Sequence, residues 1–151
     1  MEPQQHRQLA VDLFNHVWTL LDLPERTRAQ EDELIHAAHA SRHHWAQVGE
    51  PKNLARGEWQ VSRAYAEVGR PEPALHHARR CLEILEESGD GEDWDVPFAH
   101  EALARAFLVA GDTEAAEHHL AVARELAASV TDAEDREHLE NELAKLAEPS
   151  Q

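Results

Sequence analysis

The sequence predicts an all-α protein built from antiparallel helical hairpins, and three observations support this fold class. The 151 residues are 42% hydrophobic and 29% charged, rich in Ala, Leu, Glu and Arg, with no alternating apolar and polar stretch. The segment from Glu58 to Glu83 reads as two helices joined by a Gly-Arg-Pro turn, and it returns as His100 to Glu125. Turn and capping residues divide the rest of the chain into segments of helical length, so about seven helices are expected.

The N-terminal part of the chain predicts the first hairpin. Residues 5–22 place their Leu, Phe and Val side chains on one side of an amphipathic helix, which the Asp-Leu-Pro sequence ending at Pro24 terminates. Thr27 and Gln30 have the spacing of a capping box that opens a second helix at about 28–48. A glycine at position 49 then ends this helix.

The remaining boundaries follow from the same kinds of signal. Gly69 and Gly111 end the first helix of each repeat, and we expect Asp95 and Asp112 to cap the helices that follow the acidic 88–95 segment and Gly111. Thr131 and Glu134 form a second capping-box pattern. The predicted organisation is one domain over residues 1–151, with hairpins at about 5–48, 51–87 and 95–130 and a capping helix at about 131–147.

Charge and cysteine content narrow the classes of partner. The formal net charge is −16, which disfavours nucleic acid and anionic membrane surfaces because both would repel the chain. The lone cysteine, Cys81, allows no intrachain disulfide, and we expect it in the core. No apolar signal sequence or transmembrane segment is recognisable. A cytoplasmic protein that binds a peptide, a protein or a small polar ligand is therefore expected.

The two copies of the duplicated segment carry similar residues at the same spacing. The matching residues are Glu58, Val61, Ser62, Tyr65, Ala74 and Ala78 in the first copy, and His100, Leu103, Ala104, Phe107, Ala116 and Leu120 in the second. This pattern resembles the tetratricopeptide repeat, in which pairs of antiparallel helices stack side by side into a solenoid. The resemblance implies a short solenoid of three hairpins with a capping helix. Two departures stand out: Glu58 and His100 occupy the position where the family usually places a large aromatic residue, and the usual closing proline is absent.

The resemblance also implies a ligand-binding face. On a helical wheel Arg56, Trp59 and Arg63 lie opposite the apolar stripe of their helix. In proteins of the family this face lines a concave groove, and the corresponding residues of the next repeat are Phe98, Glu101 and Arg105. An Arg-Trp-Arg row suits a carboxylate or an aromatic anion. The first hypothesis is therefore a binding or scaffold module with a polar groove for a peptide or a small anionic ligand.

Glu58 lies within the apolar stripe, and a buried carboxylate needs a partner. Candidate partners are His100, Arg56, Arg63 or a histidine of the 28–48 helix. The alternatives are a structural ion pair and a catalytic role for Glu58 as acid or base.

The 28–48 helix carries a second candidate site. His36, His39 and His43 lie on one side of this helix at spacings of three and four residues, so neighbouring imidazoles could share a divalent transition metal. Aligned on the helix-ending glycines, they correspond to Arg56, Trp59 and Arg63 and would face the ligand. The alternative hypothesis is thus a metal-binding protein or metal-dependent enzyme that uses these histidines with Glu58 or Glu101. A further interpretation is that the three histidines lie on an ordinary exposed or packed helix face.

Two further expectations concern the surface. The histidine pairs 76–77 and 118–119 are expected on the convex surface, because adjacent helical residues point about 100° apart and cannot chelate one metal together. A homo-oligomer that pairs apolar end faces is a third hypothesis.

Overall fold

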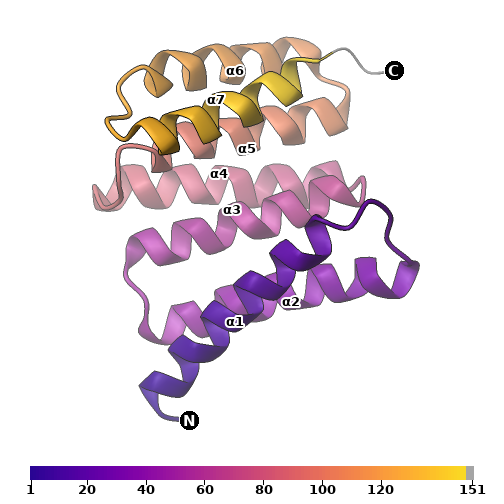
Figure 1. Cartoon of the computed structure of the whole chain (residues 1–151), viewed down its shortest axis with the longest axis vertical. Coiled ribbons are helices and arrows are strands. Elements are labelled where there is room, and N and C mark those ends of the chain that lie inside the picture. The colour runs from indigo at the N-terminus through magenta and orange to yellow at the C-terminus, as the bar shows by residue number, and fades with distance from the viewer. Residues whose placement is uncertain (149–151) are drawn as a thin grey trace.

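The computed structural model describes residues 1–148, and this part of the chain is all-helical (Figure 1). The fold class predicted from the sequence is confirmed: within residues 1–148, seven helices follow one another without strands. They are α1 (Pro3–Leu21), α2 (Arg28–Val48), α3 (Pro51–Glu67), α4 (Pro71–Ser88), α5 (Asp95–Ala110), α6 (Thr113–Ala127) and α7 (Ala133–Ala147).

The helices pack in chain order, as Figure 1 shows from α1 at the bottom to α6 and α7 at the top. The most extensive contacts join α1 to α2, α3 to α4 and α5 to α6, so each pair forms a hairpin. The first helices of the hairpins also contact one another, because α3 packs on both α1 and α5, and α5 packs on α7. The helices α1, α3, α5 and α7 therefore form a continuous row. We call the side of the molecule that this row forms the groove face.

Most helix ends follow the predicted signals. Thr27 and Gln30 form the expected capping box at α2, and Asp112 accepts the backbone N–H of Ala115 at the start of α6. Gly69 and Gly111 have φ of 76° and 80°, left-handed values that glycine adopts without the penalty of a side chain.

Two predicted caps are wrong. Trp94, not Asp95, is the N-cap of α5, and the Asp95 carboxylate instead accepts the backbone N–H of Glu92 at 2.7 Å. Asp132 caps α7 in place of Thr131. Thr131 is occupied elsewhere, since its backbone N–H and its hydroxyl both donate to Asp93, at 2.9 and 3.0 Å.

Small side chains let the helices approach closely. Ala74 and Ala116 are fully buried at equivalent positions of α4 and α6, and the Ser62 hydroxyl donates to the carbonyl of Ala74 at 2.8 Å. Cys81 is 3% exposed, and burial raises the pKa of its thiol, so it is a core residue as predicted. Leucines fill the space at both ends of the molecule, with Leu34 near the N-terminus and Leu143 in α7.

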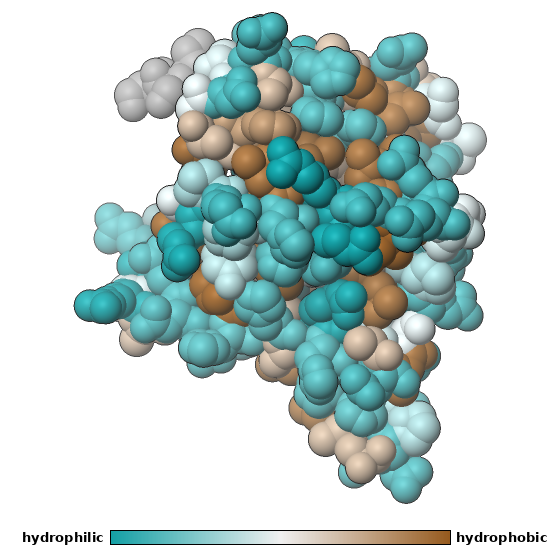
Figure 2. Space-filling model, turned by 180° about the vertical axis from the view of Figure 1, so that it is seen from behind, coloured by the Kyte–Doolittle hydropathy of each residue, from teal (hydrophilic) through white to brown (hydrophobic). Residues whose placement is uncertain are grey.

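The surface of the described residues carries little exposed hydrophobic area. Among them, the large hydrophobic side chains that are exposed are Met1, Val11 and Leu108. Seen from behind, the molecule is mostly hydrophilic, with hydrophobic residues in patches between polar side chains (Figure 2). None of the described helices is long and apolar enough to cross a membrane. Pairing of apolar end faces stays a prediction, without a large exposed apolar face to support it here.

Candidate functional site

An aromatic cavity of about 310 Å³ opens on the groove face. Its walls come from four helices that are far apart in the sequence, because α1, α3, α5 and α7 each contribute side chains, and the floor includes one residue of α4. The lining residues are Phe14, Trp18, Arg56, Trp59, Cys81, Trp94, Asp95, Phe98, Asp135 and His138.

Four aromatic side chains form a connected wall. The ring centres of Trp18 and Trp59 are 5.7 Å apart, and Phe98 meets Trp59 edge to face at 6.1 Å. Trp94 meets Phe98 edge to face at 6.2 Å. Such contacts hold aromatic rings in fixed orientations and contribute about 0.5–1.5 kcal/mol per pair beyond burial. The cavity is therefore a preformed apolar site.

Arg56 lies on this wall with its charge already compensated. Its Nε and Nη2 atoms donate to the two carboxylate oxygens of Asp95 at 3.0 and 2.9 Å, and its guanidinium lies 4.4 Å from the ring centre of Trp94. The hydrogen bond to Asp95 is the main cause of the raised pKa of Arg56. Asp95 is 4% exposed, so this pair is a fixed part of the cavity wall.

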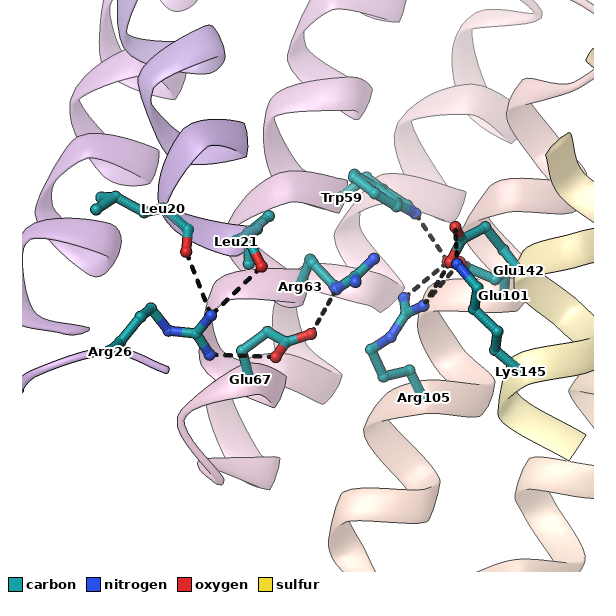
Figure 3. A network of polar contacts seen from close by, with 10 residues as sticks. All are labelled: Leu20, Leu21, Arg26, Trp59, Arg63, Glu67, Glu101, Arg105, Glu142 and Lys145. Atoms are coloured by element: carbon teal, nitrogen blue, oxygen red, sulfur yellow. Dashed lines mark hydrogen bonds and ion pairs between the residues drawn. The ribbon is translucent and has the colours of Figure 1, made fainter. Parts of the chain in front are cut away.

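A buried ion pair lies beside Trp59 (Figure 3). Arg105 donates from both terminal nitrogens to Glu101 at 2.9 Å, and the indole N–H of Trp59 donates to the same carboxylate at 3.1 Å. Glu101 is fully buried and Arg105 is 8% exposed. Glu142 of α7 lies 3.8 Å from Arg105. Glu101 and Arg105 therefore orient Trp59 from inside the fold.

A second polar network lies further along the groove face, on the other side of Trp59 in Figure 3. Arg63 donates to Glu67 at 2.9 Å, and Arg26 donates to the other oxygen of Glu67 at 3.3 Å. Arg26 also donates to the carbonyls of Leu20 and Leu21, which satisfies the C-terminal end of α1. Arg63 is thus held in an ion pair beside the cavity.

The five predicted ligand-binding residues are brought together on neighbouring helices, but only two of them line the cavity. Arg56 and Trp59 do so, whereas Arg63, Glu101 and Arg105 belong to the adjoining networks. All three arginines have carboxylate partners within the protein, so an anionic ligand would compete with these pairs.

Sequence reasoning placed Phe98 of α5 on the same face, and it lines the cavity, but it missed other lining residues. Trp18, Trp94, Asp135 and His138 were not predicted as site residues, because no pattern within their own segments indicates that they lie close to Trp59. The presence of four tryptophans in a small acidic chain was the available signal.

Glu58 has a partner other than the predicted ones. It is 7% exposed, accepts a hydrogen bond from His77 Nδ1 at 3.0 Å and lies 3.8 Å from Arg42 Nε. Burial raises its pKa, but the hydrogen bond and charge of His77 and the charge of Arg42 outweigh this effect and lower the pKa overall. The expectation that both residues of the pair 76–77 are surface residues is wrong for His77, which faces Glu58 across the hairpin. His76 is exposed as predicted.

The histidines of α2 do not line the cavity. His36, His39 and His43 are exposed, and no cavity-lining residue comes from α2. The Nε2 atom of His39 instead lies 2.8 Å from the hydroxyl of Tyr65, and partial desolvation of the ring, together with the nearby His77, lowers its pKa. Within residues 1–148, no three His, Cys, Asp or Glu side chains are arranged to hold a metal ion. The metal and catalytic hypotheses stay predictions that this geometry does not support.

Comparison with known proteins adds no further assignment: no protein-family model, curated protein or solved structure matches this chain.

Proposed function

We propose that this chain is a binding protein that holds a segment of another polypeptide along its groove face, with one side chain of that segment in the aromatic cavity. The observation that carries the proposal is the cavity itself, whose rings come from three elements, with Trp59 held by its hydrogen bond to the buried Glu101–Arg105 pair. The resemblance of the duplicated segment to tetratricopeptide repeats supports it, because those repeats bind peptides on the equivalent face.

The size and surroundings of the cavity favour a side chain of a longer ligand. Its volume of about 310 Å³ lies at the low end of ligand pockets, which span roughly 300–1,000 Å³. The groove face continues beyond it through polar side chains such as Arg63 and Glu67, which suit the backbone and neighbouring residues of an extended segment. The net charge of −16 favours a neutral or basic partner over a nucleic acid.

A displayed library of random peptides, selected on the whole chain, tests this proposal. We expect enriched peptides that bind wild type, and we expect His138→Trp to weaken them at least about tenfold, because a bulky ring at the cavity wall removes the space for the inserted side chain. His138 is exposed on α7, so the substitution leaves the core intact.

His36→Trp is the matched control, since it makes the same substitution at an exposed position of α2, outside the cavity. Circular dichroism would establish that both variants fold. The proposal fails if selection enriches no peptide, or if the enriched peptides bind His138→Trp as tightly as wild type.

A further inference from the structure

The charges around the aromatic cavity indicate which kind of side chain it accepts. Resting on the function proposed above, we infer that the inserted side chain is a lysine or an arginine. Two features carry this inference: aromatic rings that already hold guanidinium groups, and a carboxylate in the cavity lining that has no cationic partner.

The rings of this wall already bind cations within the protein. The guanidinium of Arg56 lies 4.4 Å from the ring centre of Trp94, and that of Arg63 lies 5.9 Å from the ring centre of Trp18. A cation over an aromatic face gains about 0.5–2 kcal/mol, depending on how far it is desolvated. Trp59 and Phe98 complete a wall against which the aliphatic part of a long basic side chain can pack.

The formal charges within the lining leave one carboxylate uncompensated. Arg56 and Asp95 neutralise each other through two hydrogen bonds. Asp135, on the first turn of α7, lines the same cavity, and its carboxylate makes no hydrogen bond or ion pair with another side chain in residues 1–148. His138, one turn further along α7, also lines the cavity. An ammonium or guanidinium group is the natural partner for Asp135.

The loops beside the cavity strengthen the negative field. Asp93 ties the loop between α4 and α5 to the loop between α6 and α7 through its two hydrogen bonds from Thr131. Carboxylates outnumber cations in these loops and the adjoining helix ends. The carboxylates are Asp90, Glu92, Asp93, Asp132 and Glu134, and the nearby cations outside the lining are Lys52 and Arg136.

Other classes of side chain fit less well. An aliphatic or aromatic residue would bury Asp135 against apolar groups without a partner, which costs free energy. An acidic residue would be repelled by Asp135 and by the loops. A lysine or arginine can place its methylene groups against the rings and its charged group at Asp135.

The experiment uses the peptides enriched on wild type and a substitution scan of each. We expect one lysine or arginine to be essential, with replacement by methionine weakening binding at least about tenfold, because the replacement keeps an apolar stem but loses a charge-assisted hydrogen bond. Asp135→Asn should weaken the same peptides by a similar factor, and Asp135→Lys should abolish binding. The backbone N–H of Asp135 is capped by Asp132, so these variants keep the cap of α7.

Glu134→Gln is the matched control, because it removes one carboxylate from the adjacent, exposed position of α7; we expect less than about a twofold change in affinity. The inference is overturned, and the proposed function stands, if the essential side chain of peptides blocked by His138→Trp is apolar or acidic. It is also overturned if Asp135→Asn leaves the affinity of basic peptides unchanged. Absence of any peptide sensitive to His138→Trp overturns the proposed function itself.

Discussion

The hairpins α3–α4 and α5–α6 use the same positions to join their two helices, but with different chemistry. In α3–α4, His77 donates to Glu58 at 3.0 Å and its ring stacks on Tyr65 at 5.9 Å. In α5–α6, the Nδ1 atoms of His119 and His100 are 3.0 Å apart, and the ring of His119 stacks on Phe107 at 5.6 Å. A carboxylate–imidazole pair in one repeat is thus an imidazole–imidazole pair in the next.

This difference changes how the two hairpins respond to protons. In α3–α4 the hydrogen bond and charge of His77 lower the pKa of Glu58, whereas in α5–α6 protons on both His100 and His119 would repel each other. Burial lowers the pKa of His100, with a further contribution from His118 on α6. Burial also lowers the pKa of His119, together with His100, His118 and Arg79 on α4. The lowered pKa values therefore favour the neutral forms of His100 and His119.

The groove-face positions of the two hairpins differ as well. Arg63 of α3 pairs with Glu67 at the edge of the groove, and both side chains are partly exposed. The equivalent Arg105 of α5 is buried with Glu101. The same position thus carries an ordinary surface pair in one repeat and a structural support for Trp59 in the other.

The largest expected effect comes from breaking the buried pair. Arg105→Met should lower the free energy of unfolding by about 3–5 kcal/mol, because it leaves Glu101 buried without its cation. Arg63→Met should cost about 0–1 kcal/mol, because that pair is partly exposed and its partner Glu67 keeps Arg26. Urea denaturation of both variants measures the difference.

Equal losses for the two methionine variants would contradict the distinction between the pairs. The double variant Arg105→Met with Glu101→Met sharpens the test. It removes both charges, so it should be more stable than Arg105→Met alone.

An intermediate effect is expected from pH. The pKa values of His100 and His119 are lowered from the ordinary value of 6.5, so the unfolded chain binds more protons than the folded one near this pH. The free energy of unfolding should therefore fall as the pH drops through about 6.5, and level off below the folded-state pKa values. His39 and His44 act in the same direction, because their pKa values are also lowered. The lowered pKa of Glu58 adds a separate loss below its ordinary pKa of 4.5.

Exchanging the chemistry of the two pairs isolates their contribution. His100→Glu builds the carboxylate–imidazole pair of α3–α4 into α5–α6, and it should reduce the loss of stability between about pH 7.5 and 5.5. Glu58→His should increase that loss, because Arg42 and His77 would then face a second imidazole. Urea denaturation at several pH values measures both changes; parallel pH profiles for wild type and His100→Glu would refute the explanation.

The smallest expected effect concerns the residue on which each imidazole stacks. Tyr65→Phe converts the α3–α4 hairpin to the residue type of Phe107 and removes the hydrogen bond between the tyrosine hydroxyl and His39. We expect a loss of about 0.5–1 kcal/mol, because this bond is solvent-accessible. Thermal denaturation at neutral pH measures it, and a loss well above about 2 kcal/mol would mean that His39 has a larger structural role.

Local sequence patterns predicted much of the fold. A helix begins after Thr27, and helices end near Gly69 and Gly111, as the local sequence predicted. The alanines of the repeats lie where helices approach closely. Asp95 has the local signature of a cap but forms an ion pair with Arg56. A cap prediction cannot include a competing partner from a distant helix.

The sequence predicted those residues of the candidate site whose position follows from the pattern of a single helix. The helical wheel placed Arg56 and Trp59 on the groove face, and both line the cavity. Trp18, Trp94 and Asp135 reach the same cavity from three other segments of the chain. Their convergence depends on how α1, α5 and α7 are positioned by packing against α3 and against each other.

The sequence by itself determined an all-helical chain, the approximate positions of its seven helices and the duplication that makes two hairpins equivalent. These features depend on hydrogen bonds and side-chain contacts within a few residues. Only the tertiary structure decided that Glu58 pairs with His77, that Arg105 is buried, and that Asp135 joins an aromatic cavity. Each of these outcomes depends on contacts between helices. A buried charge needs a compensating partner, and the packing of the helices decides which group lies close enough to be that partner.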